Sequence, residues 1–154
     1  RRLLRWPEPD LHMKDIEIIL RGFAMLIDSE IYAPSMVKFL NQFSKKCESH
    51  SEAQNNYLRH LFHSFLKSCK DLPAEAFLNK KNRRFNLALY EAVFNAACKP
   101  AFDEQRMLEG NLNVEEIANL ENDYEFLKAS LEGTTNTANV LKRLERAEQI
   151  INPL

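Results

Sequence analysis

The chain has 154 residues, enough for one domain of ordinary size and too few for two. Apolar residues make up 45% of it and charged residues 28%, which excludes an intrinsically disordered chain. Its 21 basic and 22 acidic residues leave a net charge of -1, which excludes a uniformly basic nucleic-acid-binding protein.

Apolar residues recur at helical spacing along almost the whole chain, and no stretch alternates as a β-strand would. The first predicted helix begins near Asp15, a residue suited to an N-cap or a first turn. Glu17 and Arg21 stand one turn apart on this helix, a spacing at which an ion pair can form. The face predicted to point inward comprises Ile16, Ile19, Leu20, Phe23, Leu26 and Ile27.

Two further helices are predicted before residue 73. The second spans about 35–47 and directly follows Pro34. The residues predicted to point inward from it are Met36, Val37, Leu40 and Phe43. The third follows Ser51, which forms a capping-box pattern with Gln54. Its inward stripe is predicted to be Leu58, Leu61, Phe62, Phe65, Leu66 and Cys69.

His60 and His63 lie three residues apart on the third helix, a spacing at which two histidines can share a metal ion. They stand with Arg59 and Lys67 on the face opposite the apolar stripe. Because a zinc site needs three or four ligands, we interpret them as part of a solvated face and predict no metal site.

The fourth helix is predicted over about 83–98 and has almost no polar side, which is typical of the buried centre of a domain. Arg84, Glu91 and Asn95 are spaced so that they would stack along one line of it. A buried charge needs a partner. Glu91 either pairs with a neighbouring helix, such as the one with Arg21, or belongs to a groove wall that faces a ligand or another domain.

Three more helices are predicted, over about 102–108, 113–131 and 140–151, with Gly133 ending the second of them. The inward residues of the last two are predicted to be Ile117, Leu120, Tyr124, Leu127 and Leu131, followed by Val140, Leu141, Leu144, Ala147 and Ile151. The sequence thus predicts an all-α fold, a single domain over 1–154 with six to seven helices around a buried central helix.

Charge is distributed unevenly along the chain. Residues 103–132 contain 2 basic and 9 acidic residues, which form either a solvated helix face or a surface for a partner. The only dense basic run is 80–84. Its cations are candidates for nucleic-acid contact, with a solvated loop as the alternative: Lys80, Lys81, Arg83 and Arg84.

The sequence predicts no catalytic residue and no cofactor for this chain, since it has no Gly-rich phosphate loop, no GxSxG motif and no paired catalytic carboxylates. Cys47, Cys69 and Cys98 form no CxxC pair, which favours three free thiols in a cytoplasmic protein. The longest apolar run, 16–26, contains two charges, so no membrane association is expected.

Three strings occur in a recognisable order: MKDIEIILR at 13–21, MVKFLNQF at 36–43 and RFNLALYEA at 84–92. This order resembles the helical part of the GmrSD-type restriction-endonuclease family (domain of unknown function 262), whose members begin with a ParB-like nuclease-fold domain. The resemblance covers about residues 3–100. It implies that the polar members of the strings hold the helices and the adjoining domain in register: Asp15, Glu17, Arg21, Arg84, Asn86 and Glu91.

The family's Asp-Gly-Gln-Gln-Arg-like signature and its His-Asn-His nuclease half are absent from this sequence. The resemblance therefore implies a non-catalytic helical accessory subdomain of a phage-defence restriction protein. Its partners would be the adjoining N-terminal ParB-like domain and, weakly, DNA, with nucleotide and divalent metal belonging to the parent protein. Arg1 in place of Met predicts a piece of a longer chain. The alternative is a self-contained helical module that binds another protein.

Overall fold

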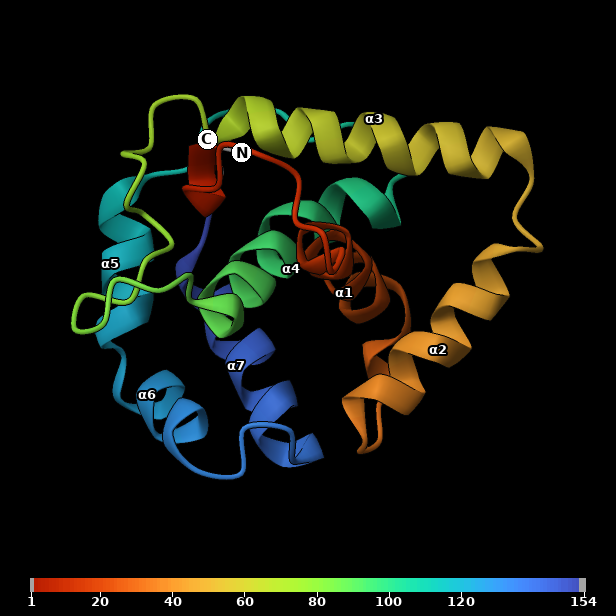
Figure 1. Cartoon of the computed structure of the whole chain (residues 1–154). Helices are drawn as coiled ribbons and strands as arrows, with labels where there is room; N and C mark the ends of the chain where they lie inside the picture. The colour runs from red at the N-terminus through yellow and green to blue at the C-terminus, as the bar shows by residue number, and fades with distance from the viewer. Residues whose placement is uncertain (1, 153–154) are drawn as a thin grey trace.

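One long helix, α4 (Leu87–Asp103), runs through the centre of the protein in its computed structural model (Figure 1). The structure describes residues 2–152, and in this range it contains seven α-helices and no β-strand. Helices α1, α3, α5 and α7 pack against α4, in which Ala92 and Val93 are buried. The predicted all-α fold around a buried central helix is therefore confirmed.

The remaining helices follow in chain order around α4 (Figure 1). They are α1 (Lys14–Asp28), α2 (Met36–Cys47), α3 (Glu52–Ser68), α5 (Val114–Asn122), α6 (Tyr124–Leu131) and α7 (Thr137–Ile150), with short 3-10 turns η1 (Arg2–Leu4) and η2 (Ser29–Ile31). The predicted capping box of Ser51 and Gln54 begins α3.

Aromatic rings fill the space between α1, α3 and α4. The Phe94 ring of α4 lies 4.9 Å from that of Phe65 on α3 and 5.4 Å from that of Phe23 on α1, both edge to face. Gly22 permits this packing, because a Cβ atom there would lie 3.0 Å from the Phe94 ring. The absence of a side chain at position 22 thus sets how closely α1 approaches α4.

The boundaries of α4 differ from the prediction. The helix begins at Leu87 because the Asn86 side chain accepts a hydrogen bond from Leu89 N at 3.2 Å and caps it. It continues through Pro100 to Asp103, so the predicted short helix over 102–108 is wrong. Burial of Ala101 stabilises this last turn, which offsets the one backbone hydrogen bond that a proline removes.

The helix predicted over 113–131 is two helices that meet at Asp123. Its carboxylate accepts a hydrogen bond from Phe126 N at 2.9 Å and begins α6, while Arg146 of α7 lies 2.8 Å away. This break turns the helix, so that Phe126 is buried. Residues predicted to be inward but found exposed are Ile16, Val37, Leu66, Tyr124, Leu127, Leu131 and Leu141.

The three cysteines are free, as predicted, with Cys69 and Cys98 buried. Burial raises the pKa of the Cys69 thiol to about 12 and also raises the pKa of Cys98. None of the helices described in residues 2–152 combines the length and apolarity needed to cross a bilayer.

Candidate functional site

The chain between α3 and α4 forms a closed loop, residues 77–86, which we call the basic loop. At its base, Asn86 N donates to Phe77 O at 2.7 Å. Near its tip, Asn79 N donates to Arg84 O at 2.8 Å, and the Asn79 side-chain oxygen accepts from two further backbone amides. These hydrogen bonds fix where the side chains of the loop can reach.

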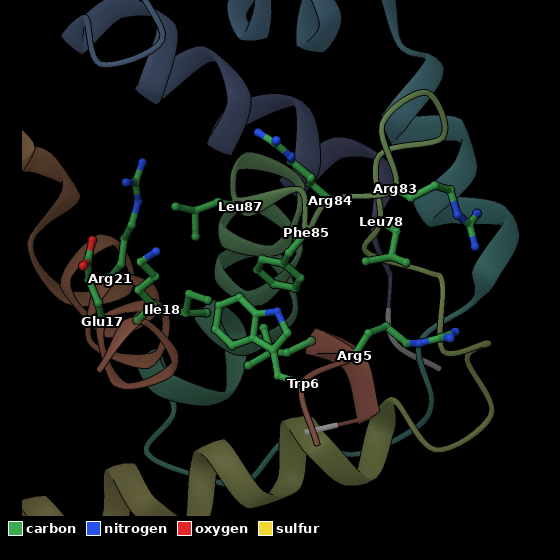
Figure 2. Close-up of a pocket in the computed structure, with 12 residues that line it drawn as sticks. Arg5, Trp6, Glu17, Ile18, Arg21, Leu78, Arg83, Arg84, Phe85 and Leu87 are labelled. Atoms are coloured by element: carbon green, nitrogen blue, oxygen red, sulfur yellow. The ribbon is translucent and has the colours of Figure 1, made fainter. Parts of the chain in front are cut away.

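The loop separates the four cations of the basic run. Lys80 points to α5, where its Nζ lies 3.0 Å from Glu121, and Lys81 is exposed. Arg83 and Arg84 are among the residues that line a pocket between the loop and α1, and Figure 2 shows the Arg83 side chain at its outer edge, pointing away from α1. Of the four cations of the predicted run, two therefore line this pocket, one pairs with α5 and one is exposed.

A cavity of about 590 Å³ lies between α1, the N-terminal segment and the basic loop; we call it the basic pocket (Figure 2). Figure 2 shows Glu17 and Arg21 of α1 on one side of this pocket and Arg83 of the loop on the other. The charged lining residues are one carboxylate and five cations, Glu17 with Arg5, Lys14, Arg21, Arg83 and Arg84. Such an excess of positive charge suits an anionic ligand.

Arg21 connects this pocket to the buried core. Its Nε donates to Oε2 of Glu91 on α4, which is only 1% exposed. The predicted link between Glu91 and the helix with Arg21 is thus confirmed, whereas Glu17 forms no ion pair with Arg21 among the described residues. The predicted line of Arg84, Glu91 and Asn95 is wrong, because Arg84 precedes the helix.

Asn95 serves the same helix contact one turn further on, where its side-chain amide donates to Met25 O of α1 at 3.1 Å. Asp15 lies buried in the first turn of α1, and its carboxylate accepts from Ile16 N at 3.0 Å. It lines a second cavity next to the basic pocket, in which two of the ten lining residues are charged. Of the six polar residues from the matched strings, three line the basic pocket: Glu17, Arg21 and Arg84.

Arg143 of α7 is 1% exposed, a burial that was not predicted from the sequence. Its guanidinium donates to Ala129 O at 2.6 Å and Thr134 O at 2.8 Å. Burial lowers the pKa of Arg143, and the nearby Glu91 carboxylate opposes that shift. In the sequence, Arg143 stands between Val140 and the inward residues Leu144 and Ala147 of α7. This position is the signal that could have predicted the burial of Arg143.

His60 and His63 are exposed, as the solvated-face interpretation predicts. Within residues 2–152, no three His, Cys, Asp or Glu residues are grouped in a way that could hold a metal ion. The comparisons with protein-family models, curated proteins and solved structures found no match for this chain. The chemistry that the basic pocket offers is recognition of an anion by arginine and lysine side chains beside aromatic rings, with Arg21 held in place by Glu91.

Proposed function

We propose that the chain is a non-catalytic helical accessory domain of a GmrSD-like, phage-defence restriction protein of the cytoplasm, in which an adjoining ParB-like domain performs the chemistry. The observation that supports this is the convergence of two matched strings. Arg21 of the first string pairs with Glu91 of the third, 70 residues later. Arg21 and Glu17 also line the same pocket as Arg84, the first residue of the third string.

The second matched string supports the same interpretation through packing. It forms most of α2, and its Phe39, Leu40 and Phe43 are buried in one cluster with Met25 of α1. All three strings therefore belong to one structural unit built around α1. In this proposal the unit positions the adjoining domain, which would bind the nucleotide and the divalent metal.

The sequence that precedes Arg1 in the gene tests this proposal. We expect it to encode an Asp-Gly-Gln-Gln-Arg-like string within a ParB-like domain. The purified chain alone should then release no phosphate from ATP or GTP with Mg²⁺ and should not cut DNA, while the longer protein does so. A start codon directly at this point, or turnover by the chain alone, would contradict the proposal.

The alternative, a self-contained module that binds another protein, is favoured by one surface. On α6, Tyr124 is 71% exposed and Leu131 76%, with Leu127 between them on the same face. A module of this kind would lose its partner when Leu131 is changed to Glu, while the accessory domain would keep its activity in the longer protein.

We expect the isolated chain to bind duplex DNA only weakly. Lys80 is paired with Glu121, which leaves Lys81, Arg83 and Arg84 for phosphate contacts. Each neutralised phosphate contributes about -0.9 to the slope of log affinity against log salt concentration. Three cations therefore give a slope no steeper than about -3. A gel-shift titration at several salt concentrations measures it.

The matched control for this titration replaces three exposed lysines outside the basic loop by alanine: Lys38 and Lys45 of α2 and Lys67 of α3. Sub-micromolar binding at low salt would contradict the prediction if it is lost in the Lys80/Lys81/Arg83 alanine variant and kept in the control. The basic loop would then be a duplex-binding site.

A further inference from the structure

We propose that the basic pocket binds a nucleoside phosphate, with the phosphate at Arg21 and Arg84 and the base against Trp6 and Phe85. The inference does not depend on the accessory role proposed above. It rests on the kinds of groups that line one cavity and on their arrangement in it (Figure 2).

Four of the five cations of the pocket have donors available for an anion, whereas Arg5 pairs with Glu75. Arg83, Arg84 and Lys14 form no ion pair with any residue in the range that the structure describes. Arg21 uses its Nε for Glu91, and its two terminal nitrogens have no partner among the described residues. Because a guanidinium presents its donors in a planar fork, it matches the oxygens of a phosphate.

Glu91 makes Arg21 the better placed of these cations. The pairing holds the Arg21 side chain, which is only 14% exposed, against α4 while the end of the guanidinium lines the pocket. A cation held in place in this way loses little conformational entropy when a ligand binds. Glu91 is therefore a positioning residue for the phosphate end of the pocket.

The remaining wall suits a flat ring. Trp6 and Phe85 are half-buried, and Ile18 and Leu87 extend the apolar surface beside them. In Figure 2 the two rings lie together at one end of the pocket, while Arg84 extends toward the other end. Nucleobases stack on aromatic side chains of this kind, a contact of about 1–3 kcal/mol per base.

Size and charge narrow the class of ligand further. A cavity of about 590 Å³ is in the range of small-molecule sites and accepts one nucleotide rather than a duplex. Glu17 disfavours an anion close to the start of α1 and offers an acceptor for a ribose hydroxyl or an amino group of the base. A free nucleotide and the phosphorylated end of a single strand share this chemistry.

The chain's single tryptophan, Trp6, lies in the pocket and reports binding through its fluorescence. ADP and GDP, titrated without metal to about 1 mM, should quench it and give a matching calorimetric signal. Pyrophosphate, which lacks a base, and adenosine, which lacks a phosphate, should each bind at least ten-fold more weakly. A 5′-phosphorylated oligothymidylate tests the strand end as the source.

Arg84→Ala should weaken nucleotide binding ten-fold or more, with circular dichroism confirming that the variant folds. The matched control is Lys81→Ala, which removes a cation of the same loop that does not line the pocket. Binding of the oligonucleotide alone would support the proposal and assign the site to a strand end. The proposal is overturned by equal losses in both variants, by pyrophosphate binding as tightly as ADP, or by no binding of any probe.

Discussion

Replacing Glu91 by alanine should destabilise the protein by about 3 kcal/mol, at the lower end of the range for breaking a buried ion pair. The carboxylate is 1% exposed, and its loss leaves Arg21 and the buried Arg143 without their nearby negative charge. The partial exposure of Arg21 places the effect at the lower end, because water reaches its guanidinium. Thermal unfolding should shift down by about 10 °C.

The matched control is Glu17→Ala, which removes an exposed glutamate of α1 with no ion pair among the described residues. It should change stability by no more than about 0.5 kcal/mol. A double-mutant cycle with Arg21→Ala then isolates the coupling between Arg21 and Glu91. A melting temperature for Glu91→Ala within about 2 °C of the parent would show that the pair contributes nothing to folding.

Phe94→Ala should have an effect of similar size, about 3–5 kcal/mol, because it removes the central ring of the aromatic cluster. Phe94 is fully buried and stacks or meets edge to face with Phe65, Phe23 and Tyr90. The surrounding helices cannot close the cavity without moving α1. Urea unfolding monitored by circular dichroism measures the loss.

Phe102→Ala provides the comparison on the same helix, since Phe102 is partly exposed and, within residues 2–152, has one aromatic neighbour, Tyr57, at 6.3 Å between ring centroids. Phe102→Ala should lower the free energy of unfolding by less than half as much as Phe94→Ala. Equal costs at the two positions would show that the centre of α4 does not depend on its aromatic packing.

Hydropathy alone was sufficient to predict the centre of this fold. The stretch that includes Ala92 and Val93 has so few polar residues that only a buried helix could accommodate it. The same pattern could not locate the helix ends, because Asn86 and Asp123 act through hydrogen bonds to particular backbone amides. Because the apolar periodicity continues across both positions, it does not show that a helix begins at either of them.

The candidate site was predictable only in part. The requirement that a buried charge has a partner made the pairing of Glu91 with the helix of Arg21 one of two alternatives, and the structure shows this pairing. The basic pocket could not be predicted from the sequence, because Arg5 and Trp6 precede α1 in a segment without apolar periodicity. These two residues come close to Arg84 only in the folded protein. Local spacing contains no information on contacts between segments so far apart.

The ion pair between Lys80 and Glu121 places the acidic stretch of α5 beside the basic loop. The positive potential of the basic loop and the negative potential of α5 therefore lie within one Debye length of each other, about 8–10 Å at ordinary salt concentrations. A long polyanion that approaches Arg83 also meets the carboxylates of α5, whereas a ligand of a few atoms is small enough to avoid them. The charge distribution of the protein thus discriminates by length, and slows the encounter with strands more than the entry of small anions.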